Sequence, residues 1–377
     1  MPADAMRTTL TRPEPLRPLL VRLVGLLLSL GLVLWLGWRL HAALATYPGL
    51  SPTVWGAADK TYGVTAALHD LSAVEVEREL EHIARLGLAW LRLPFPWAQI
   101  EAQRGQFDWA RWDALVQAAA RHNLRILALL DTTPAWARPP ESPLHTPPTE
   151  LSDFGAFAQA LAQRYGAQID AYQVWDEPNL SAHWGERYVE PRQYARLLRE
   201  AAIAIRTVDA EATILTAALA PTLEQGPLNL NEMDFLEQLY RANAAQWFDA
   251  VAAQPYGFRA PPEEAPAPQR LNFARIVLLR RVMERHGDHT KAVWITGFGW
   301  SALPADWEGA LSPWPSVSAE EQARYTAEAV AWARAHWPWL GPMCFPAWNA
   351  QLLAPPDPRR GLALVDGERA LPPLIGW

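Results

Sequence analysis

The chain has 377 residues, 50% of them hydrophobic, a net charge of −7 and one cysteine. This size suits one barrel domain of roughly 250 to 400 residues with an appendage. The acidic balance, with arginines spread thinly among acids, argues against a nucleic-acid-binding surface. The single cysteine, Cys344, excludes an intrachain disulfide framework and a cysteine-rich metal site, and no pattern predicts a metal or an organic cofactor.

The amino terminus carries a membrane signal. Residues 23–38 contain no charge, and the apolar stretch extends back to Pro18 if Arg22 lies at the membrane interface. A spanning helix needs about 20 apolar residues, with a lower limit of roughly 17. Arginines lie mainly before this stretch, a bias that predicts a cytoplasmic amino terminus and export of the rest.

These signals set the predicted organisation of the chain. We predict a basic cytoplasmic tail over 1–17, a transmembrane signal anchor over 18–40, a linker over 41–54 and a barrel over 55–377. A small-x-small site at Ala43-Leu44-Ala45 keeps an alternative open, in which a signal peptide is cleaved near Ala45 and the protein is secreted. Both interpretations place the globular part outside the cytoplasm.

After Trp55, short apolar runs alternate with amphipathic segments, which is typical of βα units and a parallel sheet. The predicted strands are 62–68, 88–93, 124–130, 169–175, 213–217, 248–254, 292–296 and 341–347. The predicted helices are 72–86, 109–122, 192–207, 232–243, 270–285 and 318–336, the first and last opening with Ser-x-x-Glu capping boxes. A proline-rich loop over 132–149 is expected to form a cleft wall. Eight such units predict a closed (β/α)8 TIM barrel.

Two carboxylates follow the fourth predicted strand. The run 169–175 is apolar and β-prone, and Pro178 cannot continue a strand because it lacks an N–H. Asp176 and Glu177 therefore lie at the carboxyl end of the strand, where barrel enzymes collect their catalytic residues. Together with Trp175, Pro178 and Asn179 they read Trp-Asp-Glu-Pro-Asn.

This motif resembles the strand-4 motif, usually Trp-Asn-Glu-Pro-Asn, of clan A retaining glycoside hydrolases, which are (β/α)8 barrels. The segments 90–97, 127–136, 248–257 and 361–367 are similar to other strand-end segments of the family 39-like and cellulase-like groups. The resemblance implies that Glu177 is the general acid/base and that Arg92 helps to hold a nucleophile carboxylate. It also implies a nucleophilic glutamate at the end of strand 7, where this chain has Gly297.

The chain departs from the family pattern at three positions. Asp176 replaces the asparagine that contacts the sugar 2-hydroxyl, Gln254 replaces a histidine, and Gly297 replaces the nucleophile. Retention by the double-displacement route requires two carboxyl groups about 5 to 5.5 Å apart. Glycine supplies no attacking atom, so no covalent intermediate can form at position 297.

Glu177 can donate a proton only if a negative neighbour or desolvation raises its pKa. Asp176 is adjacent, but successive strand residues point to opposite faces, so the two need not meet. Glu177 could instead be ion-paired to an arginine, and Asp176 could be a catalytic group or a helix cap. An inverting route needs a second carboxyl group roughly 6.5 to 9.5 Å away. The candidates for that base are Asp131, Asp306 and Glu308.

Several strand ends carry side chains suited to sugars. Tryptophans at positions 97, 136, 175, 300 and 348 could stack on sugar rings or simply pack the barrel top, and about two of the five are expected to face a ligand. Arg92 could bind an anionic sugar or pair with Asp131 or Asp176. The predicted substrate-binding residues are Arg92, Trp97, Asp131, Trp136, Asn179, Gln254, Tyr256, Trp300 and Trp348.

The sequence therefore predicts a membrane-anchored, extracytoplasmic glycoside hydrolase-like barrel that takes an oligo- or polysaccharide as its partner. If it is active, it hydrolyses O-glycosyl bonds, with Glu177 as the general acid/base and Asp176 as the second catalytic candidate. The alternative is a glycan-binding or scaffolding pseudo-glycosidase that lost its nucleophile at Gly297. Transfer from an activated sugar onto an acceptor is a third hypothesis.

Overall fold

The computed structural model describes residues 25–26, 28–37 and 61–370. The chain divides into two units, 1–50 and 51–377. In the first unit, residues 25–26 and 28–37 are helical. Within the described residues, no helix combines the length and the apolar character needed to cross a membrane. The remainder of the predicted anchor, and all of the predicted tail and linker, fall outside the described residues.

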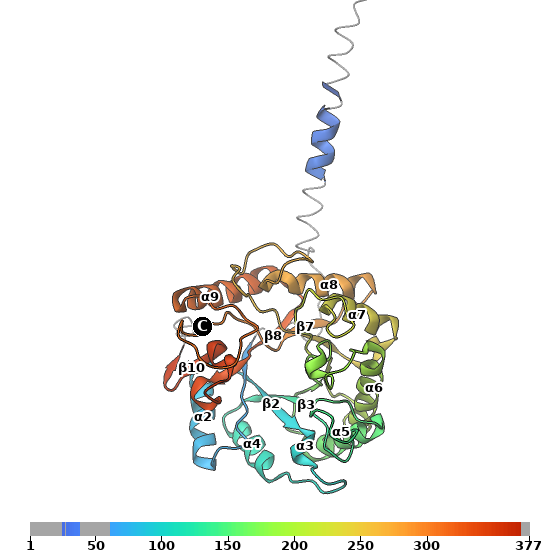
Figure 1. Cartoon of the computed structure of the whole chain (residues 1–377), viewed down its shortest axis with the longest axis vertical. Coiled ribbons are helices and arrows are strands. Elements are labelled where there is room, and N and C mark those ends of the chain that lie inside the picture. Colours follow the sequence, from blue (N-terminus) through green and yellow to red (C-terminus); the bar gives the residue numbers. More distant parts are fainter. Residues whose placement is uncertain (1–24, 27, 38–60, 371–377) are drawn as a thin grey trace, which may run out of the picture. The chain divides into compact units, whose positions relative to one another are not determined.

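The second unit is a closed barrel of parallel strands that follow one another in chain order (Figure 1). Strand β8 pairs with β1, with Met343 opposite Tyr62, and this pairing closes the ring. The predicted (β/α)8 fold is confirmed, and each predicted strand overlaps an observed one. The strands are β1 (Tyr62–Thr65), β2 (Trp90–Pro96), β3 (Arg125–Asp131), β4 (Ala171–Val174), β5 (Ile214–Leu215), β6 (Ala250–Ala253), β7 (Ala292–Ile295) and β8 (Leu340–Phe345).

Helices form an outer ring around these strands (Figure 1). They are α2 (Ala73–Arg85), α3 (Trp97–Ile100), α4 (Ala110–Arg121), α5 (Leu151–Tyr165), α6 (Pro191–Val208), α7 (Glu232–Arg241), α8 (Ile276–Arg285) and α9 (Ala319–His336). Both predicted capping boxes are present, at Ser72 with Glu75 and at Ser318 with Glu321. Each satisfies backbone N–H groups that have no partner at the start of a helix.

The sequence patterns missed the short helix α3 and two larger parts of the fold. Helix α5 was not predicted, and its N-cap, Glu150, makes no side-chain capping bond that would mark its start. A small sheet after β8 was also missed: β10 (Ala363–Asp366) pairs in parallel with β9 (Ala347–Asn349) and antiparallel with β11 (Arg369–Ala370). Strands of two to four residues leave little periodic signal.

The barrel wall is largely apolar on both sides, with polar exceptions such as Arg92 on β2 and Gln173 on β4. Every residue of β4, β6, β7 and β8 is buried. This burial is expected where helices cover the outer face of a parallel sheet and side chains fill its inside. Polar side chains at the strand ends and in the loops that follow them are therefore the ones that reach solvent from the barrel itself.

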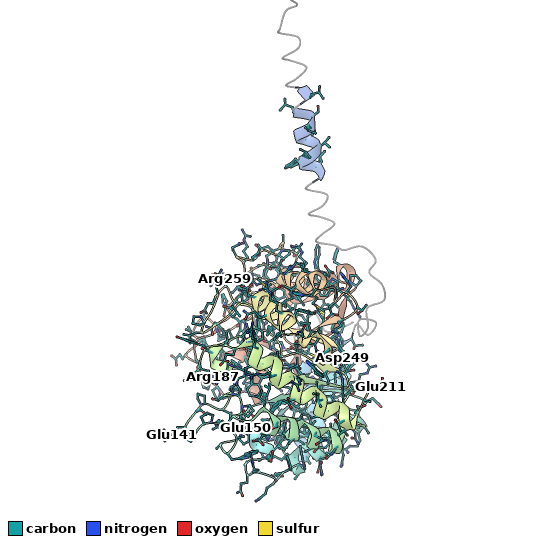
Figure 2. All side chains as sticks on the ribbon, turned by 90° about the vertical axis from the view of Figure 1, so that its right-hand side faces the viewer. Glu141, Glu150, Arg187, Glu211, Asp249 and Arg259 are labelled. Atoms are coloured by element: carbon teal, nitrogen blue, oxygen red, sulfur yellow. The ribbon has the colours of Figure 1, made fainter. Side chains whose placement is uncertain are left out.

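The two ends of the barrel can be told apart in Figure 2 by the labelled residues. Arg187 and Arg259, from loops that follow β4 and β6, lie on one side of the molecule, whereas Glu211 and Asp249, from segments that precede β5 and β6, lie on the other. Asp249 accepts a hydrogen bond from the backbone N–H of Ile214 and pairs with Arg206, so the amino-terminal end is engaged in structural contacts. The carboxyl-terminal end carries the residues predicted to act on a ligand.

Candidate active site at the carboxyl ends of the strands

The backbone that follows β4 has an uncommon conformation. Trp175 and Glu177 have φ values of 72° and 49°, in the left-handed region that residues with side chains rarely adopt. Each such residue costs about 1 to 3 kcal/mol, and these conformations cluster at functional sites. The N–H of Glu177 donates to Ala218 O at 2.9 Å, which ties the bend to the segment after β5.

This bend has a consequence for the two carboxylates. In a regular strand, Asp176 and Glu177 would point to opposite faces. The left-handed residues break that alternation, and the negative charge of Asp176 is close enough to raise the pKa of Glu177. Both carboxyl groups therefore belong to one electrostatic centre.

Asp176 is held at one of its two oxygens. Its Oδ1 lies 2.9 Å from Arg92 Nη2 in an ion pair and accepts hydrogen bonds from Gln173 Nε2 at 3.0 Å and Gln254 Nε2 at 3.2 Å. Among the described residues, no protein donor reaches Oδ2, and the side chain is 20% exposed. Of the two partners predicted for Arg92, the structure shows Asp176. The carboxylate is fixed on one side and open on the other.

Arg92 is a rigid support for this carboxylate. It is 4% exposed, and its Nε donates to Gln173 Oε1 at 2.9 Å. A buried guanidinium keeps a fixed orientation when its donors are engaged in this way. Gln173 thus links Arg92 to Asp176 by bonding to both.

Glu177 meets the requirement for a proton donor. Burial raises the pKa of its carboxyl group, the positive charges of His183 and Arg92 oppose that rise, and Asp176 adds to it. His183 Nε2 lies 3.3 Å from Glu177 Oε2, and the glutamate side chain keeps 16% exposure. The group is therefore protonated to a higher pH than an ordinary glutamate and remains accessible.

A third carboxyl group lies at the end of β3. Burial and, next, the charge of Asp176 raise the pKa of Asp131 to about 7, while Arg92 and His183 oppose the rise. Its Oδ1 is buried and has no hydrogen-bond partner among the described residues. Buried polar atoms without a partner are rare, and a ligand is one explanation for them.

Gly297 follows the end of β7 and borders the same centre. A Cβ atom at this position would lie 3.0 Å from Tyr256 Oη and 3.5 Å from Gln254 Cγ. Gln254 also bonds to Asp176, so the ends of β4 and β7 meet one cluster of side chains. Burial, followed by the charges of Glu177 and Asp176, raises the pKa of Tyr256 well above its usual range, and the phenol stays protonated.

The rim tryptophans are less accessible than a role in sugar stacking requires. Trp97, Trp300 and Trp348 are at most 2% exposed, so these rings have no face open to a sugar. Their indole N–H groups donate to Glu101, Ala260 O and Glu79, respectively. They pack the barrel top, as the alternative interpretation held.

Two of these rings have specific packing partners. Trp300 covers Gly257 so closely that a Cβ atom there would lie 1.9 Å from the indole. Trp175 is also buried, and its indole bonds to His183 O, which fixes the loop that carries the histidine. Trp136 alone of the five predicted tryptophans keeps partial exposure, with the guanidinium of Arg104 4.6 Å from its ring centroid.

Asn179 also has a different role from the predicted one. It is fully buried, and its side-chain amide donates to Ala220 O and Leu230 O while accepting from the N–H of Ala220. These bonds join the loop after β4 to the loop after β5 and leave no donor for a sugar. Asp306 and Glu308, the other candidate bases, are exposed on a loop.

Sequence reasoning missed several residues of the centre. His183 and Gln173 contact the two carboxylates directly, and the ring of His145 lies 5.3 Å from that of His183. Gln173 carried a detectable signal, because it is a polar residue in an apolar strand. The histidines come from loops, whose placement depends on tertiary contacts. Among the described residues, no group of His, Cys, Asp and Glu is suited to hold a metal ion.

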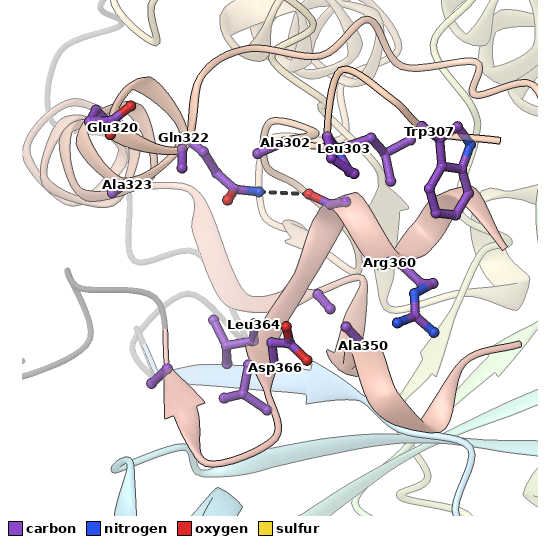
Figure 3. Close-up of a pocket in the computed structure, with 16 residues that line it drawn as sticks. Ala302, Leu303, Trp307, Glu320, Gln322, Ala323, Ala350, Arg360, Leu364 and Asp366 are labelled. Carbon is purple, nitrogen blue, oxygen red and sulfur yellow. Dashed lines mark hydrogen bonds between the residues drawn. The ribbon is translucent and has the colours of Figure 1, made fainter. Parts of the chain in front are cut away.

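A cavity of about 670 Å³ lies elsewhere, between α9 and the small sheet (Figure 3). Gln322 donates to Gly361 O at 2.7 Å across it, and Arg360 and Asp366 lie on its wall. The residues that line it include none of the predicted catalytic or substrate-binding residues. The carboxylate centre is therefore a separate site.

No protein-family description and no curated protein matches the sequence. Solved structures do match. A family 39 glycoside hydrolase from Bacteroides cellulosilyticus WH2 aligns with a TM-score of 0.64 at 18% identity, over 86% of this chain and 64% of that one. A GH39 enzyme from Xanthomonas axonopodis pv. citri aligns with a TM-score of 0.61 at 17% identity, over 88% and 67%.

A third structure belongs to another family of the same architecture. GH5_18 from Streptomyces cattleya, in complex with GlcNAc, aligns with a TM-score of 0.60 at 18% identity, over 84% of this chain and 78% of that one. The chain spans about two thirds of the length of the two GH39 structures. At these identities the likeness establishes the fold: the protein has the eight-stranded barrel seen in glycoside hydrolases of families 39 and 5.

Proposed function

We propose that this barrel binds an oligo- or polysaccharide at the carboxyl ends of its strands and hydrolyses an O-glycosidic bond, with Glu177 as the general acid. The environment of Glu177 carries the proposal. Its carboxyl group is largely buried, has a raised pKa, lies beside His183 and still touches solvent. The barrel shared with glycoside hydrolases, one of them in complex with GlcNAc, supports a carbohydrate ligand.

In this mechanism Glu177 donates its proton to the glycosidic oxygen as the bond to the anomeric carbon breaks. The ion-paired Asp176 places a negative charge beside the carbon that becomes electron-poor. Gly297 offers no atom to attack that carbon. The attacking group must therefore be water or a group of the substrate itself.

Release of reducing sugar from a glycan panel tests the role of Glu177. Glu177→Gln keeps the shape and removes the proton, so we expect turnover to fall about 100-fold or more. Glu186→Gln is the matched control, because Glu186 is exposed on the same loop. Equal turnover by Glu177→Gln and the unaltered protein would exclude Glu177 as the acid.

A second candidate function is glycan binding without hydrolysis. The position after β7 favours it, since Gly297 has no side chain and Tyr256 Oη lies against the space a carboxylate would use. Calorimetric titration with oligosaccharides that shows binding, together with no released sugar, supports this candidate. Gly297→Glu then shows whether the protein lost only the nucleophile or also the ligand-binding site. A gain of hydrolysis means that the acid and the sugar-binding subsites are intact.

We also propose that the barrel is extracytoplasmic and held at the membrane by the anchor over 18–40. The uncharged stretch and the arginines before it support this placement. Alkaline carbonate extraction of membranes and protease treatment of spheroplasts test it. A mature amino terminus near Ala45 would instead favour the secreted form.

A further inference from the structure

We infer that the substrate is a 2-acetamido-2-deoxy sugar and that its own acetamido group supplies the attacking atom that Gly297 lacks. This inference rests on the proposed function, because it requires Glu177 to act at the glycosidic oxygen. It specifies the sugar class and assigns Asp176 a contact with the group on C2.

The oxygen of Asp176 that has no protein partner indicates what kind of ligand group it can bind. Oδ1 is occupied by Arg92, Gln173 and Gln254, and Oδ2 meets no protein donor among the described residues. An ion-paired carboxylate accepts hydrogen bonds and donates none. The ligand group that meets Oδ2 must therefore carry a hydrogen.

The position of Asp176 identifies that group. Glu177 acts at the oxygen on C1, and Asp176 is the adjacent residue in the same electrostatic centre. The neighbours of C1 in a pyranose are the ring oxygen, which carries no hydrogen, and C2. The hydrogen that Oδ2 accepts therefore belongs to the substituent on C2, either a hydroxyl or the N–H of an acetamido group.

The empty β7 end favours the acetamido group. With a 2-hydroxyl sugar, no side chain at Gly297 can attack C1, and the attacking group would have to be water activated by another carboxyl group. Of the candidate bases, Asp306 and Glu308 are exposed on a loop, and the raised pKa of Asp131, about 7, favours its protonated form below that pH. An acetamido carbonyl oxygen can reach C1 within the same molecule, and intramolecular attack of this kind reaches effective concentrations of about 10⁵ M or more. Glycosidases with substrate-assisted chemistry are known exceptions to the two-carboxylate rule.

The electron balance closes with the residues present. The carbonyl oxygen bonds to C1, the bond from C1 to the leaving oxygen breaks, and the proton of Glu177 moves to that oxygen. The amide nitrogen becomes positively charged, and Asp176 stabilises it by accepting its N–H. Water then adds to C1 and gives a proton to Glu177, and the electron pair returns to the acetamido carbonyl. The product keeps the anomeric configuration.

Two neighbouring groups fit this chemistry. Tyr256 is protonated, and its hydroxyl borders the space at Gly297. It donates to Gln254 Oε1 over a long 3.4 Å, so a ligand carbonyl oxygen in this space can take over that hydrogen bond. Asp131 Oδ1 is buried without a partner at the end of the adjacent strand β3, as expected of a polar atom that meets a ligand. The Tyr256 hydroxyl and Asp131 Oδ1 therefore support a ligand at this site independently of Asp176 and Glu177.

Paired aryl glycosides test the inference in the unaltered protein. The panel holds gluco- and galacto-configured sugars, each with 2-acetamido and 2-hydroxyl forms. We expect Glu177-dependent release from a 2-acetamido sugar only. Within that sugar, rates should fall with each fluorine added to the acetyl group, because fluorine weakens the attacking carbonyl. Hydrolysis of 2-hydroxy sugars, or rates insensitive to fluorine, would overturn the inference and leave the proposed function standing.

Asp176→Asn gives a second test with a binding readout. We expect it to slow hydrolysis of the 2-acetamido sugar about 100-fold or more, as removal of a transition-state stabiliser does. It should also weaken binding of a thiazoline-fused sugar, which mimics the cyclised intermediate, measured by calorimetry. Glu177→Gln should retain that binding, and circular dichroism checks the fold of both variants. Unchanged thiazoline affinity in Asp176→Asn would refute the contact. Absence of Glu177-dependent turnover of every glycan by the unaltered protein would instead refute the proposed function.

Discussion

Two buried arginines of this barrel hold carboxylates in different ways. Arg275 pairs with Glu232, and it also donates to backbone carbonyls of the loops after β5 and β6. Both glutamate oxygens are used, one by Arg275 and the other by the N–H of Thr222, and the side chain is 3% exposed. Asp176, paired with Arg92, is 20% exposed and has one oxygen without a protein donor among the described residues.

The difference shows what an ion pair can be used for. The closed pair at Arg275 joins two loops and has no capacity left for a ligand. The open pair at Arg92 fixes a charge and presents it at the barrel mouth. Stability should therefore depend more on the closed pair, and ligand chemistry more on the open one.

The largest effect on stability is expected from Arg275→Met. This change leaves Glu232 buried without its partner and several carbonyls without a donor, at a cost of about 3 to 5 kcal/mol. Urea unfolding measures the loss. Arg270→Met is the control, because Arg270 is 65% exposed and its pair with Glu264 should contribute at most about 1 kcal/mol. Similar losses in the two variants would remove the distinction between closed and exposed pairs.

The carboxyl group of Asp131, which lies near the open pair, should make the free energy of unfolding depend on pH. Its folded pKa of about 7 exceeds its unfolded value, so its contribution is complete below the unfolded pKa and is lost as pH rises through 7. Between pH 5 and pH 8 we expect up to about 3 kcal/mol less stability from this group. Asp131→Asn should flatten that dependence in urea unfolding at both pH values, whereas the exposed Asp306→Asn should not. An unchanged pH profile in Asp131→Asn would count against the raised pKa.

Arg92→Lys probes the geometry of the open pair. Lysine keeps the charge but cannot reach Gln173, Asp176 and Thr65 with one planar fork. We expect a loss of about 1 to 3 kcal/mol in thermal or urea unfolding and a larger proportional loss of glycan affinity. Arg78→Lys serves as the control, because the Arg78 side chain is 59% exposed in its pair with Glu79. If glycan affinity survives, Arg92 does not orient the ligand-facing carboxylate.

The smallest effect is expected at the empty end of β7. In Gly297→Ala the new methyl group meets Tyr256 Oη at 3.0 Å, which the hydroxyl can relieve by a small shift. We expect a change within about 1 kcal/mol. The change should be less destabilising when Tyr256→Phe is also present, and a double-mutant cycle measures that coupling. Additive changes would mean that the hydroxyl does not fill this space.

Much of the fold could be predicted from local patterns. Apolar runs marked the strands, and Ser72 and Ser318 marked helix starts because capping is encoded within four residues. Helix α5 escaped because it follows a proline-rich loop, lacks a side-chain cap and contains Gly155. Tertiary packing explains that glycine, since a Cβ there would lie 3.3 Å from Glu200 O on α6.

Residues of the site could be predicted only where a local sequence pattern, such as the end of a strand, fixes their place in the fold. Asp176 and Glu177 could be placed because a strand ends at them, yet the backbone bend at this point depends on left-handed residues that the sequence does not mark. His183 could not be found, since its contact with Glu177 depends on a loop held by Trp175. Rim tryptophans such as Trp348 were misjudged because burial by distant segments, here α2, is not visible in the sequence.

The bend at Trp175 and Glu177 has a further consequence. When two catalytic acids come from opposite strands, their spacing changes with the diameter and breathing of the whole barrel. Asp176 and Glu177 are consecutive residues of one chain segment, so a short stretch of covalent backbone limits how far apart their carboxyl groups can lie. In the proposed mechanism the end of β7 supplies no carboxyl group, so a change in the loop after β7 should leave the spacing between Asp176 and Glu177 unaltered.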